Sequence, residues 1–197
     1  MSSTVLYMSM SLDGFVTGPN VRPDNGLGDG GERLHEWIFP DGEFDLTGAK
    51  LTGANRTVWD EMMSTGAVIA GRRTFEPAGG WDGDHHDGVP IFIVARDEPG
   101  IDISQWPLVT YTPDVTAAVA AAKQAAGDRN VLFHGAAAAR LALDAGVLDE
   151  LEIHLVPVLL GQGTRLFGDR DPASVELGHT RVLEGDGVTH LHYRVTR

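Results

Sequence analysis

Short apolar runs in the first two thirds of the chain predict strands of a buried sheet. Residues Thr4–Ser11 alternate and are rich in β-forming side chains, whereas Ala67–Gly71 (AVIAG) and Val89–Arg96 (VPIFIVAR) are continuously apolar. Continuous apolar runs of this length are typical of parallel strands that are covered on both faces. Two shorter strands are predicted at Val109–Thr112 and Asn130–Gly135.

Helical patterns lie between these strands. Val58, Met62 and Met63 form a helical stripe that Asn55 can cap at its N-terminus and Gly66 can end. The sequence predicts helices over residues 55–66, 114–127 and 136–146, a short helix from Arg72 and a helical turn within residues 31–39.

The C-terminal part changes to a pattern of antiparallel strands. Residues 148–161 (LDELEIHLVPVLLG) predict a long strand, and Gly187–Val195 alternates strictly, with residues 175–183 as its partner across a turn. Together these patterns predict an α/β fold, a doubly wound, mostly parallel sheet with an antiparallel C-terminal hairpin. No linker divides the chain, so residues 1–197 are expected to form a single domain. The stretch from Pro19 to Gly53 is too long for a simple connection, which suggests a functional loop.

Composition narrows the possible functions. The chain has 197 residues, a formal net charge of -13 and no cysteine, so disulfides and thiolate chemistry are excluded. The excess of acidic residues and the lack of a basic run argue against a nucleic-acid partner. The N-terminus has no secretory pattern and no apolar stretch is long enough to cross a membrane, so a cytoplasmic protein without a membrane partner is expected.

Two strand–glycine–helix junctions are candidates for binding an anionic ligand. At the first, Gly71 is followed by Arg72, Arg73 and Thr74, and at the second, Gly135 is followed by a run of alanines. Backbone N–H groups at a helix start favour an anion, and a guanidinium can bind a phosphate through two hydrogen bonds. Two such junctions on one sheet suit a dinucleotide, although the G-x-G-x-x-G fingerprint is absent. The alternative is that the arginines are solvated or paired with acidic neighbours, and that the alanines only pack.

Several segments, in order, resemble the dihydrofolate-reductase-like superfamily, and specifically the riboflavin-biosynthesis reductase domain, the C-terminal domain of a bifunctional deaminase–reductase. The resemblance covers nearly the whole chain and is most specific over residues 146–167. The segments that carry it are SLDGFVTG, AVIAGRRTFE, PIFIVAR, VLFHGAAAARLALDAGVLDELEIHLVPVLLGQGTRLF and the terminal hairpin.

The resemblance implies NADPH as the hydride donor and assigns residues to it. Gly71, Arg72, Arg73 and Thr74 match the motif for the cofactor phosphate, and Arg96 ends a strand that passes the adenosine. The residues that match the glycine-rich turn under the pyrophosphate are His134, Gly135, Ala136 and Ala137; the family often has consecutive glycines where this chain has Gly135 and Ala136. The turn Gly161, Gln162 and Gly163 is expected near the ligand, with a plain loop as the alternative.

The resemblance also implies a small-molecule substrate. Asp13 is the acidic residue best placed near the nicotinamide, and its alternative role is that of a turn residue. Asn55 stands near the position of the usual carboxylate of dihydrofolate reductases, which argues against dihydrofolate. His35 and Trp37, together with Phe39, are expected to cover a flat ring, unless they form a small core under the loop.

These inferences predict an NADPH-dependent reductase of a small heteroaromatic, pyrimidinone- or pteridine-like substrate, resembling 5-amino-6-(5-phosphoribosylamino)uracil reductase. The alternatives are dihydrofolate reductase activity and a non-catalytic nucleotide-binding or regulatory protein on the same fold. The chemistry needs no metal, and the adjacent His85 and His86 are not expected to form a metal site. His190 and His192 share a strand face that is expected to be exposed.

A homodimer is also expected. The resemblance implies it, and residues 151–160 (LEIHLVPVLL) are too apolar for an exposed edge strand.

Overall fold

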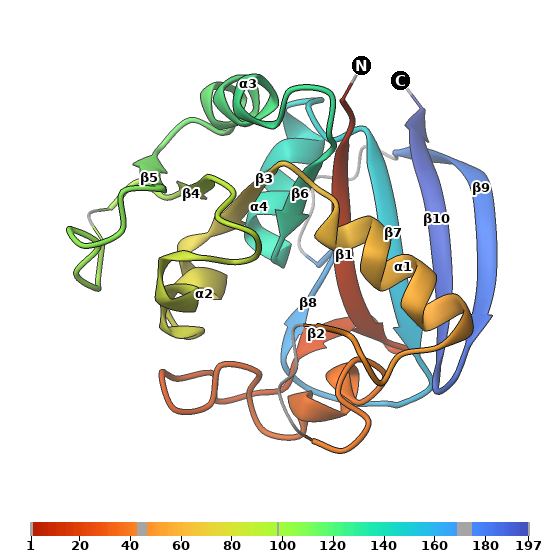
Figure 1. The fold of residues 1–197 in the computed structure, drawn as a ribbon. Coiled ribbons are helices and arrows are strands. Elements are labelled where there is room, and N and C mark those ends of the chain that lie inside the picture. Colours follow the sequence, from red (N-terminus) through yellow and green to blue (C-terminus); the bar gives the residue numbers. More distant parts are fainter. Residues whose placement is uncertain (1, 43–46, 98, 169–174, 197) are drawn as a thin grey trace.

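The computed structural model describes residues 2–42, 47–97, 99–168 and 175–196, and a central sheet of eight strands organises them (Figure 1). The strand order is β5-β4-β3-β6-β1-β7-β10-β9. The first six run parallel, β10 is antiparallel to both β7 and β9, and the predicted fold class is therefore confirmed. The strands are β1 (Thr4–Ser11), β3 (Ala67–Gly71), β4 (Ile91–Val94), β5 (Val109–Thr112), β6 (Val131–His134), β7 (Glu150–Val156), β9 (Glu176–Gly185) and β10 (Val188–Thr196).

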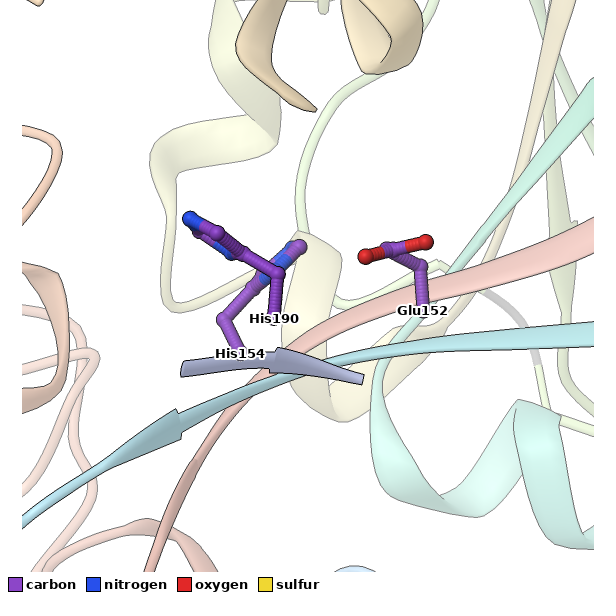
Figure 2. Close-up of side chains that lie close together, drawn as sticks. All are labelled: Glu152, His154 and His190. Carbon is purple, nitrogen blue, oxygen red and sulfur yellow. The ribbon is translucent and has the colours of Figure 1, made fainter. Parts of the chain in front are cut away.

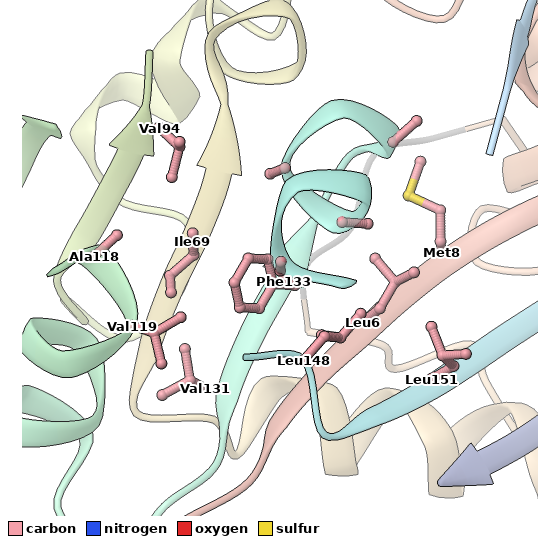
Figure 3. Close-up of a cluster of buried hydrophobic side chains, with 14 of the residues drawn as sticks. Leu6, Met8, Ile69, Val94, Ala118, Val119, Val131, Phe133, Leu148 and Leu151 are labelled. Atoms are coloured by element: carbon pink, nitrogen blue, oxygen red, sulfur yellow. The ribbon is translucent and has the colours of Figure 1, made fainter. Parts of the chain in front are cut away.

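Helices cover both faces of this sheet. The helices are α1 (Gly53–Met63), α2 (Arg72–Phe75), α3 (Val115–Ala126) and α4 (Ala136–Asp144), with two 3-10 turns, η1 (Gly31–His35) and η2 (Gly79–Gly83). Apolar side chains of α3 and α4 pack with Leu6, Ile69 and Phe133 in one core, which Figure 3 shows. Apolar side chains of α1 pack on the opposite face, so the sheet is buried between two layers, as its continuous apolar strands predict.

β1 shows how the sequence serves both cores. Leu6 and Met8 belong to the core under α3 and α4, whereas Val5 and Tyr7 belong to the core under α1. Successive side chains of a strand point to opposite faces, so a central strand needs apolar residues at nearly every position.

A second, two-stranded sheet is not predicted by the sequence. β2 (Phe15–Thr17) pairs antiparallel with β8 (Thr164–Arg165) and ties the loop after β1 to the chain after β7. Residues 19–42 follow β2 and lie, with η1, below the carboxyl ends of β1 and β7 in Figure 1. The long loop is therefore placed at the edge of the sheet where ligands bind in open α/β folds.

Three sequence predictions are wrong in detail. Helix α1 begins at Gly53 with Thr52 as its cap, and Asn55 is not a cap but a buried residue inside the helix. β7 ends at Val156 because Pro157 lacks the N–H that a continuing strand would donate. His190 is buried, because α1 covers the strand face that was expected to be exposed.

The argument from β7 to a homodimer is also wrong. β7 lies between β1 and β10, and the described edge strands of the sheet are β5 and β9. The apolar character of β7 is therefore explained within one chain, and the homodimer stays a prediction. Among the described residues, no helix has both the length and the apolar composition needed to cross a membrane.

Candidate functional site

A large cavity of about 1530 Å³ lies at the carboxyl ends of the central strands. Its walls come from the ends of β3 and β6, from the middle of β1, from η1 and its loop, and from η2. Open α/β sheets bind ligands at this edge, where the strands end and the connecting loops begin. The two predicted glycine junctions and the predicted ring-binding residues therefore meet in one cavity.

The two glycine junctions lie side by side. β3 and β6 are neighbours in the sheet, and Gly71 to Thr74 and Gly135 to Ala137 all line the cavity. Neither α2 nor α4 has a side-chain cap at its start, so their first N–H groups remain available to a ligand. Gly135 has φ 93, and a Cβ there would run into the side chain of Thr74. The close approach of the two junctions thus requires glycine at this position.

The two adjacent arginines have different environments. Arg72 forms ion pairs with Glu76 at 3.5 Å and with Asp97 at 3.6 Å, as the alternative interpretation expected. Arg73 is exposed, lines the cavity and has no ion pair among the described residues. Arg73 is therefore the cation best able to meet an anionic ligand.

Several residues assigned by resemblance do not line the cavity. Arg96 is exposed beyond the end of β4, and Gly161 to Gly163 form an exposed turn, whose neighbour Thr164 does reach the cavity wall. This placement corresponds to the alternative of a plain loop for Gly161 to Gly163.

Asp13 holds a turn rather than facing the cavity. Its carboxylate accepts hydrogen bonds from Ser11 Oγ at 2.6 Å, from the backbone N–H of Leu160 at 3.1 Å and from that of Gly161 at 2.7 Å. The Ser11 hydroxyl, followed by these backbone donors, lowers the pKa of Asp13. Asp13 is not among the cavity-lining residues, so its geometry supports the role of a turn residue.

Ring side chains also line the cavity. His35, Trp37 and Phe39 line it, as the sequence suggested, and His134 reaches it from the end of β6. Asn55 does not line the cavity: its side-chain amide donates to the backbone carbonyls of Trp37 at 3.4 Å and of Asp186 at 3.1 Å, and so lies behind Trp37. Asn55 is therefore a supporting residue and not a direct ligand contact.

Sequence reasoning missed other cavity residues, of which His154 is the most informative. His154 is 2% exposed and contacts Trp37, with ring centroids 4.8 Å apart. His85, Trp81, Tyr7 and Arg140 also line the cavity and were not singled out for it. The signal for His154 was present in the strand LEIHLV, where Glu152 and His154 are polar positions in an otherwise apolar run and share one face.

The histidines of the cavity are neutral at physiological pH. Burial lowers the pKa of His35 and that of His134 to about 4, and it lowers the pKa of His85 and that of His154 well below the usual value. Neutral imidazoles cannot supply positive charge to a ligand, but each offers one donor and one acceptor nitrogen. The positive charge of the site therefore resides in its arginines, and the rings provide hydrogen bonds.

Glu152, His154 and His190 form the one three-ligand group found in the described part of the chain, with donor atoms within 4.8 Å of one another. Figure 2 shows these side chains on one face of β7 and β10. Their types suit a divalent cation, but Glu152 already accepts from Arg181 at 3.2 Å and from His192 at 2.9 Å. Two cationic partners on the carboxylate weaken the case for a metal ion, and we assign none.

Comparison with known proteins identifies the fold family. The model of the RibD C-terminal domain matches residues 3–191. No curated protein sequence matches the chain significantly.

Solved structures share the fold at low sequence identity. A putative riboflavin biosynthesis protein from Shewanella sp. PV-4 superposes with a TM-score of 0.68 at 19% identity, covering 99% of both chains. RibD from Acinetobacter baumannii gives 0.63 at 18% identity, and the chain spans 59% of that protein. A pyrimidine reductase-like protein from Corynebacterium diphtheriae gives 0.61 at 13% identity, covering 100% of this chain and 92% of the other. With a family model that matches almost its full length, the chain belongs to the RibD C-terminal domain family.

Proposed function

We propose that the protein is an NADPH-dependent reductase of a small heteroaromatic, pyrimidinone-like ring. The observation that carries this proposal is that two uncapped helix starts and a set of rings open onto the same cavity. The helix starts suit phosphates and the rings suit a flat ring, and a dinucleotide and a heterocyclic substrate need both kinds of contact together. Membership in the RibD C-terminal domain family supports it, as does the similarity to proteins described as riboflavin biosynthesis and pyrimidine reductase-like proteins.

The residues of the cavity fit a nicotinamide dinucleotide phosphate. Gly71 to Thr74 and Gly135 to Ala137 would hold its phosphates through backbone N–H groups, and Arg73 would bind the additional phosphate that distinguishes NADPH from NADH. When bound, the cofactor supplies a hydride. The protein itself binds and orients the two rings and excludes water from between them.

The neutral histidines define how the chain can assist the reaction. His35, His134 and His154 cannot act as acids near neutral pH, because burial keeps each ring unprotonated. They can hold a substrate in position by accepting hydrogen bonds from it. The proposed contribution of the chain to rate is therefore mainly orientation.

The experiment is a titration followed by an activity assay. NADPH is titrated into the protein by cofactor fluorescence, and its oxidation is then followed with a panel of aminopyrimidinones and pteridines, dihydrofolate included. We expect saturable binding and oxidation with at least one aminopyrimidinone. Failure of NADPH to bind would refute the proposal.

One observation favours the alternative of a nucleotide-binding protein without catalysis. Asp13, the carboxylate that was expected near the nicotinamide, does not line the cavity. Its carboxylate instead accepts a hydrogen bond from the backbone N–H of Gly161 in a turn. In that case NADPH would bind, and no ring of the panel would oxidise it.

A further inference from the structure

A chain of hydrogen bonds leads from helix α1 to the cavity. The side-chain amide of Asn55 donates to two backbone carbonyls, so its Oδ1 is the atom that faces His190 Nε2, at 3.1 Å. On its other side, His190 Nδ1 lies 3.0 Å from Nδ1 of His154, its direct cross-strand partner (Figure 2). All three side chains are buried.

This geometry fixes the tautomer of both rings. Asn55 Oδ1 can only accept, so His190 Nε2 carries a hydrogen and donates to it. Burial lowers the pKa of His190 and of His154, so both rings are neutral and each carries a single N–H. His190 Nδ1 is therefore bare and accepts from His154 Nδ1–H. His154 Nε2 is then left as a bare acceptor, and it is buried without any hydrogen-bond partner in the described part of the chain.

His154 lines the cavity, and two more unpartnered nitrogens lie on the same wall. They are His134 Nδ1 and His35 Nδ1, both buried atoms of cavity-lining rings. Protonation of either would lower the pKa of His154, so the three rings are close enough to act on one another. A buried polar atom without a partner is rare in native proteins, and a ligand is one way to satisfy it.

We propose that the Asn55–His190–His154 chain fixes His154 as a hydrogen-bond acceptor for the substrate, and that His154, with His134 and His35, selects a neutral ring whose edge presents N–H donors. This inference rests on the proposed function and adds which groups of the ring are recognised and by which residues. A ring that offers only carbonyl oxygens would leave His154 Nε2 without a hydrogen-bond donor. The oxygens of a carboxylate would be repelled by the lone pair of this nitrogen.

Trp37 lies against His154 and can report on binding there. Its indole contacts the rings of His154 and His190 and is held by a hydrogen bond from Nε1 to Ser9 Oγ at 3.0 Å. Because Trp37 and His154 line the same cavity and are in contact, a ligand that binds at His154 changes the surroundings of the indole. Binding should therefore change the fluorescence of Trp37.

The first test is the tautomer itself, measured on the free wild-type protein at neutral pH by the nitrogen chemical shifts of its histidines. We expect His154 protonated on Nδ1 and His190 protonated on Nε2. A His154 ring protonated on Nε2, or on both nitrogens, would overturn the inference.

The second test compares two probes, a diaminouracil and the same ring with every nitrogen methylated, titrated without NADPH. We expect the wild-type protein to bind the diaminouracil at least tenfold more tightly. H154L, which removes the acceptor, should lose this preference, whereas H154Q, which keeps one donor and one acceptor, should retain most of it. If H154L still binds the diaminouracil more tightly than the methylated ring, the methyl groups and not His154 cause the preference, and the inference is overturned.

Equal binding of the two probes by the wild-type protein, or no binding of either, would also overturn it. So would stoichiometric binding of Zn²⁺ that H154L abolishes, because the cluster would then be a cation site. Both tests omit NADPH, so their failure leaves the proposed reductase standing. A retained preference without any NADPH oxidation would refute the reductase and keep the recognition site.

Discussion

Arg72 and Arg73 are adjacent in the sequence but should not contribute equally to cofactor choice. Glu76 and Asp97 already pair with Arg72, whereas Arg73 lines the cavity without an ion pair in the described part of the chain. A charge-assisted hydrogen bond is worth about 1.5–3 kcal/mol, which corresponds to tenfold or more in affinity. We therefore expect R73A to weaken NADPH binding by at least tenfold and to leave NADH binding nearly unchanged, as measured by fluorescence titration.

The matched control for Arg73 is Arg96, an exposed arginine beyond the end of β4 that does not line the cavity. R96A removes the same charge from the same protein and should change neither affinity. A loss of NADPH binding of similar size in both variants would mean that net charge, and not Arg73, sets the preference.

Gly135 should tolerate no side chain. G135A would place a Cβ on the side chain of Thr74 in a backbone with φ 93, so we expect a loss of roughly 2–4 kcal/mol in the free energy of unfolding. Urea denaturation measures it, and T74A in the same protein should restore part of the loss. G30A is the control, since Gly30 has φ 75 and ψ 0, in the left-handed region, but no heavy atom within 4 Å of an added Cβ, and it should cost only about 1–2 kcal/mol.

Among the elements, the long apolar strands and the capped helices could be predicted from the sequence. β1, β3 and β5 have the predicted bounds. Almost every residue of β1 and β3 is buried, which leaves a nearly continuous apolar signal, whereas the edge strand β5 is marked by its β-branched and aromatic residues. α3 lies between the Asp114 cap and Gly127, as predicted. β2 and β8 could not be predicted, since strands of three and two residues show no measurable period.

The error at Asn55 has a different cause. Asn is a good N-cap by local chemistry, but here its amide is used for contacts with residues 18 and 131 positions away. Such tertiary use of a polar side chain leaves no local pattern in the sequence.

His192 on strand β10 should make the free energy of unfolding fall as the pH becomes alkaline. Hydrogen bonds to Glu150 at 2.8 Å and Glu152 at 2.9 Å, both on β7, raise the pKa of His192 from 6.5 to about 9. The other charged groups of this cluster are Arg181 on β9, which binds Glu152, and Glu61 on α1, which binds Arg181.

A histidine pKa that is raised on folding stabilises the protein fully below its unfolded value of 6.5 and loses this effect as the pH rises through about 9. We expect the free energy of unfolding of the wild-type protein to fall over this window more steeply than that of H192Q, as measured by urea denaturation at several pH values. H179Q, on the exposed strand β9, is the control and should follow the wild type. Parallel pH profiles for H192Q and the wild type would contradict the assignment.

At the scale of the whole molecule, the fold determines which of the candidate residues meet. The glycine junctions could be found because each is a local pattern of strand, glycine and helix. The grouping of His35, His134 and His154 around the cavity could not be found in the same way, because the three histidines come from separate elements. Their polar character alone does not say which of them lie together. Asp13 was misplaced for the same reason, since its partners Leu160 and Gly161 lie almost 150 residues further along the chain.

The homodimer stays a prediction, and the structure moves its expected interface from β7 to β9. β9 is ten residues long, has a strand partner on one side only in the described sheet, and exposes Leu177 and Val182 by 42% and 49%. An exposed edge of this length favours pairing with a second copy, and a two-fold axis beside β9 would join the two sheets.

We expect light scattering at micromolar concentrations to give twice the chain mass of 21.1 kDa for the wild-type protein, and 21.1 kDa for V182K. L141K, which adds the same charge at an equally exposed apolar position on α4, should stay dimeric. A wild-type mass of 21.1 kDa would refute the dimer, and dissociation by L141K but not by V182K would place the interface on α4.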